Sequence, residues 1–303
     1  MDNTLPIEKR YIFSASAVAF AAHIRRPADH QFKAVASSAL PVTGGLAEAS
    51  SGPQSYQEVI SFQSASTSVS GDYADTRRAV DFTKGNFGDN ELSTQTFVDA
   101  RLSGLRIIGA RDQGGTGFAK PVTFVAKELH ARLESHSDRR GPNAFRGLEA
   151  NFQGISVDGS ELIVTTAPEV CTHYETYEKL VKAYHEDGDF RKRYGALFYP
   201  TGHEKTGISS ILSKPEIGEG GMVAGTVVTN LRWAGAQPVG AEIRSNRLTV
   251  PGIGTIFFGE IVYQPNTRQL TLLRFQLGSP TGGEGSACNV GSNGGGMPPS
   301  QGD

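Results

Sequence analysis

Apolar and polar residues alternate in short stretches along most of this chain. Alternation with a period of two is typical of β-strands, whose successive side chains point to opposite faces of a sheet. Turn-forming runs such as Val157-Asp158-Gly159-Ser160 separate the stretches. The pattern predicts strands at Tyr11–Ile24, Phe32–Ala36, Glu58–Val69, Thr96–Ile108, Val122–Leu133, Phe152–Val157, Glu161–Thr165, Met222–Trp233, Arg247–Val250, Thr255–Tyr263 and Leu270–Leu277.

One segment, from Thr172 to about Tyr194, has the spacing of an amphipathic helix instead. Thr172 and Glu175 fit a capping box, in which each side chain satisfies a free backbone N–H of the first turn. Gly188 interrupts the pattern, so two shorter helices, at 172–187 and 189–195, are an alternative. We expect a helical insertion near 172–195 that packs an apolar stripe on a sheet. The stripe consists of Tyr174, Tyr177, Val181 and Tyr184.

Two distant segments have similar sequences. Residues 20–45, FAAHIRRPADHQFKAVASSALPVTGG, align without a gap with residues 258–283, FGEIVYQPNTRQLTLLRFQLGSPTGG. The similarity predicts that the chain uses one hairpin unit twice. A shorter repeat links Ala100–Gly109 with Ala150–Gly159, and its inner glycine predicts a bulge or bend within a strand.

The segment from Lys9 to Pro27, KRYIFSASAVAFAAHIRRP, has two possible interpretations. Basic residues, an apolar run and a small-residue site ending at Ala21 are typical of a secretory signal peptide. Two serines, however, interrupt the run with strand-like alternation, and its second half belongs to the repeated hairpin. We therefore favour a first strand, with a secreted or surface protein that loses residues 1–21 as the alternative.

These elements together predict a mainly β fold, a sandwich or a barrel-like pair of sheets built from the duplicated hairpin unit. We expect a mobile N-terminus at 1–8, a single β-rich domain at 9–283 and a Gly-rich flexible tail at 284–303. The tail holds the one concentrated run among the 37 glycines of the 303-residue chain.

Composition argues against several classes of protein. The chain has 29 basic and 31 acidic residues, a formal net charge of −2, which argues against a dedicated nucleic-acid or anionic-membrane binder. No apolar run reaches the roughly 18 residues that a membrane-spanning helix needs. Cys171 and Cys288 are the two cysteines, and their separation indicates unpaired thiols in a reducing compartment. We expect a cytoplasmic protein.

Candidate catalytic residues are few. Cys171 precedes the predicted helix, whose dipole would stabilise a thiolate, and His173 is close to it in sequence. His203 and Glu204 are neighbours in a polar loop, where a catalytic pair could lie. The seven histidines lack the spacing of metal motifs, so we predict no metal and no cofactor.

Aromatic residues offer a candidate ligand site. Tyr177, Tyr184 and Trp233 could line an apolar pocket between the helix and a sheet, where a small-molecule ligand could bind. The alternative is that these rings only fill the core, which is the ordinary role of buried aromatic side chains.

The segments YIFSASAVAFAAHIRRP, ASSALPVTGG and GTIFFGEIVYQPNTRQLTLLRFQLGSPTGG resemble the opening and closing segments of a group of uncharacterised bacterial, mainly β proteins of about 300 residues. A helix with a "TY..L...Y" pattern, as at Thr176-Tyr177 to Tyr184, interrupts the strands in that group. The resemblance implies an intact unit with an unprocessed N-terminus. It implies no activity, cofactor or catalytic residue.

Three functions follow from these observations, in order of preference. The first is a non-catalytic binding or self-assembling structural protein that associates through β edges with an unknown partner. The second is a small-molecule enzyme, a hydrolase or isomerase, with its pocket between the helix and the sheet. The third is the secreted or surface protein that the signal-peptide interpretation requires.

Overall fold

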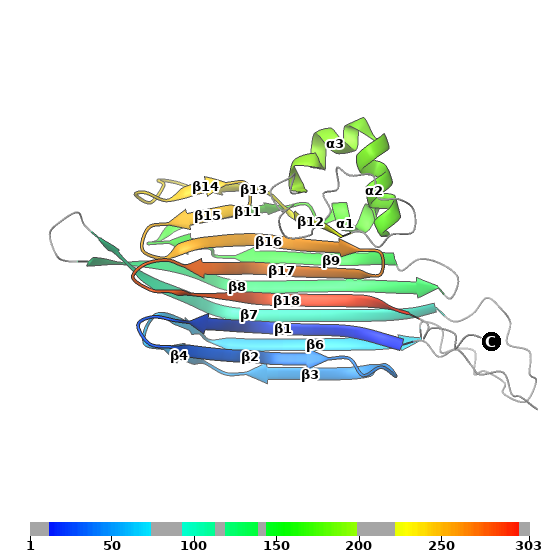
Figure 1. The fold of residues 1–303 in the computed structure, drawn as a ribbon, viewed down its shortest axis with the longest axis horizontal. Helices are drawn as coiled ribbons and strands as arrows, with labels where there is room; N and C mark the ends of the chain where they lie inside the picture. The colour runs from blue at the N-terminus through cyan, green and yellow to red at the C-terminus, as the bar shows by residue number, and fades with distance from the viewer. Residues whose placement is uncertain (1–11, 74–92, 113–118, 139–143, 199–221, 297–303) are drawn as a thin grey trace, which may run out of the picture.

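The computed structural model describes residues 12–73, 93–112, 119–138, 144–198 and 222–296. These residues form two large antiparallel sheets with a group of short helices at one side (Figure 1). The predicted mainly β fold is therefore confirmed.

Sheet A contains eight strands: β1 (Ile12–Ile24), β2 (His30–Ala39), β12 (Val223–Thr226), β14 (Glu242–Arg244), β15 (Arg247–Val250), β16 (Gly254–Gln264), β17 (Thr267–Leu277) and β18 (Gly283–Gly296). Their order is β14–β15–β16–β17–β18–β1–β2, and β12 also pairs with β16. Every pairing is antiparallel, so the sheet is built from hairpins and short connections.

Sheet B contains ten strands: β3 (Gly45–Ser51), β4 (Gln54–Tyr56), β5 (Ile60–Phe62), β6 (Ser64–Tyr73), β7 (Ser93–Asp112), β8 (Ala119–Asp138), β9 (Ala144–Gln153), β10 (Ser156–Val157), β11 (Ser160–Thr166) and β13 (Val228–Trp233). The long strands β7 and β8 form its centre. On one side of them lie β6, β3, β5 and β4, and on the other lie β9, β10, β11 and β13.

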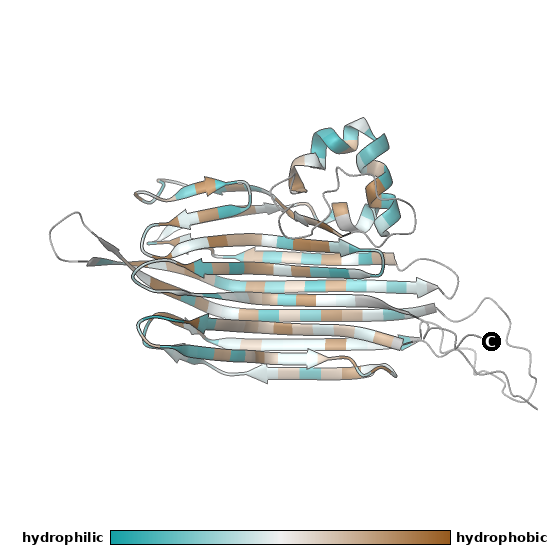
Figure 2. Ribbon diagram, in the orientation of Figure 1, coloured by the Kyte–Doolittle hydropathy of each residue, from teal (hydrophilic) through white to brown (hydrophobic). Residues whose placement is uncertain are grey.

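The two sheets pack face to face as a sandwich. Central strands β1 and β18 of sheet A contact β7 and β8 of sheet B. Alternate residues of these strands, such as Phe20, Leu102 and Leu129, are fully buried between the sheets. Figure 2 shows the resulting bands of hydrophobic and hydrophilic residues along the strands. The period-two alternation of the sequence thus separates a core-facing side from a solvent-facing side of each sheet.

The predicted strand at Tyr11–Ile24 is confirmed by β1, which lies between β18 and β2 in sheet A. Segments 20–45 and 258–283 both contain hairpins of this sheet, β1–β2 and β16–β17. Phe20 pairs with Val35 in the first hairpin, and the aligned residues Phe258 and Leu273 pair in the second. The duplication itself stays a prediction.

The predicted flexible tail at 284–303 is wrong for residues 284–296. These residues belong to β18, which pairs with β17 on one side and with β1 on the other. Glycine is required here by close packing: a Cβ on Gly285 would lie 2.4 Å from the ring of Phe275 and 2.8 Å from the Cβ of Ala22. The predicted mobile N-terminus at 1–8 and residues 297–303 lie outside the described residues.

Three predicted strands are each divided in the structure. The segment Phe152–Val157 covers the end of β9 and the whole of β10, with Gly154 and Ile155 between them. The segment Glu58–Val69 forms β5 and β6, with a bend at Gln63. The segment Met222–Trp233 forms β12 in sheet A and β13 in sheet B, and Val227 lies between them. The backbone N–H of Val227 donates to Gly259 O, while its carbonyl accepts from the N–H of Ala167. The chain therefore crosses from one sheet to the other at this residue.

The helical insertion near 172–195 is present as α1 (Glu169–His173), α2 (Tyr177–Glu186) and α3 (Gly188–Tyr194), followed by the 3-10 turn η1 (Gly195–Leu197). The helix is interrupted one residue before the predicted position: the break is at Asp187, and Gly188 is the first residue of α3. The predicted capping box is wrong, because Thr172 lies within α1. The hydroxyl of Thr176 instead caps α2 by accepting a hydrogen bond from the backbone N–H of Lys179 at 3.2 Å.

Residues with a positive φ angle, here called left-handed residues, lie side by side on strands of sheet A. At this row the alternation of buried and exposed side chains shifts by one residue. Gly259, Cys288 and Ala36 have φ angles of 59°, 50° and 46° and lie on β16, β18 and β2. The register places Leu272 of β17 and Ala19 of β1 between them. Two consecutive residues are buried at this row on β16, β17, β18 and β1, whereas on β2 the buried Ala36 follows the half-buried Val35.

Sheet B has a matching row. Gly104 on β7 and Gly154 after β9 have φ angles of 66° and 58°, and Lys127 of β8 lies between them. A Cβ on Gly154 would meet the Lys127 side chain at 2.5 Å, so both conformation and space favour glycine. These are the inner glycines of the shorter repeat. Gly154 lies at a bend as predicted, whereas the register of β7 with β8 continues without a shift through Gly104.

Candidate functional site

The two sheets end differently at the two sides of the sandwich. On one side the last strands are β2 of sheet A and β3 of sheet B, which we call the open edge. Within the described residues, β2 pairs with β1 alone and β3 pairs with β6 alone. Both strands therefore present a row of backbone N–H and C=O groups that another strand could pair with. They are the lowest strands in Figure 1.

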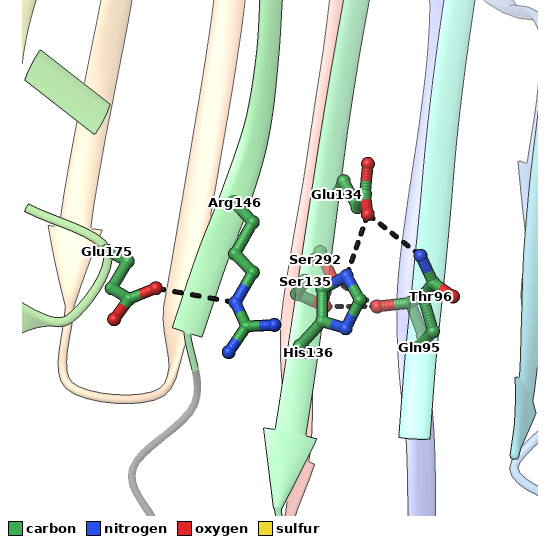
Figure 3. Close-up of polar contacts among 8 residues, drawn as sticks. All are labelled: Gln95, Thr96, Glu134, Ser135, His136, Arg146, Glu175 and Ser292. Atoms are coloured by element: carbon green, nitrogen blue, oxygen red, sulfur yellow. Dashed lines mark hydrogen bonds and ion pairs between the residues drawn. The ribbon is translucent and has the colours of Figure 1, made fainter. Parts of the chain in front are cut away.

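On the opposite side the last strands are β14 of sheet A and β13 of sheet B, which pairs with β11 alone among the described residues. There β12 and β13 connect the two sheets through Val227, and the end strand β14 has three residues. The helices cover β9, where the backbone N–H of Phe145 donates to the carbonyl of Glu175 at 2.9 Å. Arg146 of β9 also donates to the Glu175 carboxylate at 3.4 Å (Figure 3). Short or covered strands are the usual protection against edge-to-edge pairing.

The edge strand β3 has little such protection. Its register with β6 is continuous from Gly45 to Ser51. Between Leu46 and Ser51 it has no proline and no left-handed residue, and Glu48 is its one charged side chain. The sequence GLAEASS also lacks the large alternating apolar residues that would have predicted a strand, which explains why β3 was missed.

Exposed apolar side chains gather at this edge. The described residues include three large hydrophobic side chains classed as exposed, Val42, Leu46 and Val239. Val42 and Leu46, each 63% exposed, lie at the turn into β3 and on β3 itself. The core-facing Ala47 and Ala49 of β3 are half-buried. The core is therefore incomplete along β3, and a further strand would cover it.

The neighbouring edge strand β2 is better protected. It carries the exposed charge of Lys33 and the left-handed residue Ala36, next to a shift in its register with β1. At its start, His30 stacks on Tyr56 of β4 with ring centroids 4.1 Å apart, and the Tyr56 hydroxyl donates to Ala28 O at 2.9 Å. Charges, bulges and covering side chains discourage strand addition, so β3 is the more accessible edge.

A second polar feature lies on the outer face of sheet B. Every second residue of β8 from Glu128 to His136 is ionisable, and these side chains point away from the core. They are Glu128, His130, Arg132, Glu134 and His136. The sequence ELHARLESH shows this alternation directly, but it was not recognised as a candidate site. On β7, Phe97 lies under Arg132, with 5.3 Å from the guanidinium carbon to the ring centroid.

Glu134 contacts two neighbouring polar side chains of this face, His136 and Gln95 (Figure 3). Its carboxylate is 2.7 Å from His136 Nε2 and accepts a hydrogen bond from the Gln95 amide at 2.8 Å. Gly147 of β9 lies opposite and leaves the space that Glu134 occupies. Burial tends to raise the pKa of Glu134, but the contacts with His136 and Gln95 and the charge of Arg132 outweigh it and lower the pKa.

His130 forms a similar pair further along β8. Its Nε2 is 2.6 Å from the Asp99 carboxylate of β7, and its Nδ1 is 3.4 Å from the Glu149 carboxylate of β9. The two carboxylates contact different ring nitrogens and could not share one metal ion through this ring. Within the described ranges, no three His, Cys, Asp or Glu residues are grouped as metal ligands. The face carries alternating charges, which suit electrostatic contacts with a partner.

A cluster of three hydroxyl groups links the two sheets inside the core (Figure 3). Ser292 of β18 lies 3.0 Å from the Thr96 hydroxyl of β7 and 2.8 Å from the Ser135 hydroxyl of β8. Thr96 and Ser135 also hydrogen-bond to each other, so the three oxygens form a closed triangle. All three side chains are buried, and the triangle satisfies them without water.

The described residues do not test whether the predicted catalytic residues come together. Cys171 lies in α1, but its side chain is outside what the structure describes, and His203 and Glu204 lie outside the described residues. His173 is exposed at the end of α1. The other cysteine, Cys288, is a free thiol buried in the core, and burial raises its pKa. A buried, protonated thiol is a poor nucleophile.

The predicted ligand-binding aromatics lie on two elements, Tyr177 and Tyr184 on α2 and Trp233 on β13. Tyr177 is buried and faces the core, where burial raises its pKa. Tyr184 contacts Phe198, with ring centroids 6.1 Å apart, and Trp233 lies on β13. An open groove of about 760 Å³ lies among the helices, lined by His173, Tyr174, Lys179, Lys182, Ala183, Glu186, Asp187, Gly188 and Asp189. Of the predicted site residues whose side chains the structure describes, only His173 lines it.

None of the described helices has the length and apolar composition needed to cross a membrane. A family model described as a domain of unknown function, DUF8256, matches residues 11–85. Its described part spans β1 to β6 and so includes the open edge. No curated protein and no solved structure matches the chain.

Proposed function

We propose that this protein is a non-catalytic binding or structural protein that self-associates by pairing of β-strands at the open edge. The observation that carries this proposal is the contrast between the two sides of the sandwich. On one side β12 and β13 join the two sheets through Val227, whereas on the other side β3 pairs only with β6 among the described residues and lies beside exposed Val42 and Leu46.

Addition of a strand at this edge would both pair the outer backbone groups of β3 and cover its half-buried side chains. A partner strand supplies hydrogen-bond partners for the free N–H and C=O groups of β3, and its side chains cover the half-buried Ala47 and Ala49. A cytoplasmic location and an origin from a duplicated hairpin unit complete this proposal. The free thiol of Cys288 and the shared Phe20–Val35 and Phe258–Leu273 pairing support them.

The test measures the mass of the full chain by sedimentation equilibrium over a range of concentrations. We expect the wild-type protein to form particles heavier than the monomer. Leu46→Lys should weaken association at least roughly tenfold, because a lysine on an edge strand opposes pairing. Val239→Lys is the matched control, since Val239 is also exposed but lies in the turn before β14.

Both substitutions replace exposed side chains, so the fold should persist, which circular dichroism can verify. A wild-type chain that stays monomeric at all concentrations would contradict the proposal. So would equal effects of Leu46→Lys and Val239→Lys on the association constant.

A further inference from the structure

We infer that the partner of β3 is β3 of a second copy of this chain, antiparallel to it, with a two-fold axis at Glu48. This inference rests on the proposed self-association and adds its geometry. A two-fold interface uses the same surface on both copies and closes after two, so it also explains how an accessible edge avoids endless growth.

The faces of the sheet limit the possible registers. In β3, Ala47 and Ala49 point to the core, because they pair with Val69 and Thr67, whereas Glu48 points outward beside Ser68. A register displaced by one residue would place core-facing residues opposite outward-facing ones. It would also set backbone groups that point to the free edge opposite groups that point away. The remaining registers are those that set core-facing residues of one copy opposite core-facing residues of the other.

Among these, one register pairs the whole strand. It sets Gly45 opposite Ser51, Leu46 opposite Ser50 and Ala47 opposite Ala49, and all seven residues of β3 are used. A displacement by two residues in either direction leaves two residues of each β3 without a partner. The full register therefore gains the most backbone hydrogen bonds, and it packs the half-buried alanines of the two copies against each other.

The full register has one unfavourable contact. Glu48 lies opposite Glu48 of the second copy, and like charges directly opposite each other weaken a strand pair. Displaced registers would instead set Glu48 opposite Leu46 or Ser50. The effect of the charge at residue 48 on the strength of the dimer therefore distinguishes the full register from the displaced ones.

The first experiment compares dimer dissociation constants of the full chain by sedimentation equilibrium. Glu48→Gln should tighten the wild-type dimer by up to about fivefold, because it removes the repulsion. The second mixes wild type with isotope-labelled Glu48→Lys and counts dimers by native mass spectrometry. Mixed dimers should exceed the statistical proportion, since each sets a glutamate opposite a lysine. Glu178→Lys, on the exposed face of α2, is the matched control and should mix statistically.

The outcomes separate the two proposals. If neither wild type nor Glu48→Gln forms dimers, self-association and this inference both fail. If wild type dimerises but mixes with Glu48→Lys in the statistical proportion, self-association stands and the two-fold pairing at Glu48 is wrong. An equal excess of mixed dimers with Glu178→Lys would also overturn it, because the preference would then come from overall charge.

Discussion

At the scale of single residues, the hydroxyl triangle of Thr96, Ser135 and Ser292 is the clearest case of mutual dependence. Each oxygen is buried and has the other two as partners, and the triangle joins strands from both sheets. Such a set aligns the sheets, because a shift of β18 against β7 and β8 would leave buried hydroxyls without hydrogen bonds.

We therefore expect Ser292→Ala to lower the free energy of unfolding by about 1–3 kcal/mol, since it leaves two buried hydroxyls with fewer partners. The triple variant Thr96→Val, Ser135→Ala, Ser292→Ala should cost less than this single change, because no buried hydroxyl then remains. Urea denaturation measures both values. A triple variant less stable than Ser292→Ala would contradict this account.

Glu134 predicts a pH dependence of stability. Its pKa is lowered in the folded protein, so its contribution is present above the ordinary glutamate pKa of about 4.3 and is lost as the pH falls through the lowered value. Glu134→Gln should therefore reduce the free energy of unfolding near pH 7 by up to about 1 kcal/mol, since the pair is partly solvated.

Denaturation of both proteins between neutral and acidic pH tests this. The difference between wild type and Glu134→Gln should shrink as the solution is acidified, and a difference that grows would contradict the assigned contacts. Glu178→Gln is the control, because Glu178 is exposed on α2 and its replacement should change stability little at any of these pH values.

At the scale of elements, the start of α2 is fixed by one side chain. Thr176 is buried and its hydroxyl accepts the backbone N–H of Lys179, whereas the exposed Thr172 bonds to the carbonyl of Glu169 within α1. Thr176→Ala should lower the free energy of unfolding by about 1 kcal/mol, the usual effect of losing an N-cap. Thr172→Ala should have little effect. Calorimetry of the two variants decides between the observed cap and the one predicted from sequence.

The left-handed rows explain which elements the sequence pattern predicts well. Strands such as β15 and β17 alternate regularly over most of their length and were predicted close to their true positions. At Ala19-Phe20 and Leu272-Leu273, two consecutive buried residues break the alternation. A simple period-two pattern cannot anticipate this shift, although the inner glycines at 104 and 154 did indicate it.

At the scale of the whole molecule, the sheet topology is the feature that the sequence predicts least well. The separation of Met222–Trp233 into two sheets depends on hydrogen bonds of Val227 to both, which no local pattern encodes. Strand β3 has small side chains, so neither it nor the open edge could be predicted from hydrophobic spacing. What the alternation of apolar and polar residues did indicate was a large, mainly β fold.

The central position of β18 has a consequence for how the chain is made. Its residues 283–296 separate β1 from β17, so the pairing of sheet A cannot be completed until β18 has left the ribosome. Until then, the edge of β1 that pairs with β18 stays unpaired while about 260 residues are synthesised. Contacts between residues so distant in sequence form slowly. Strand β1, which is made well before β18, therefore stays incompletely paired for much of synthesis, and a chaperone that binds exposed apolar strands would protect it during that time.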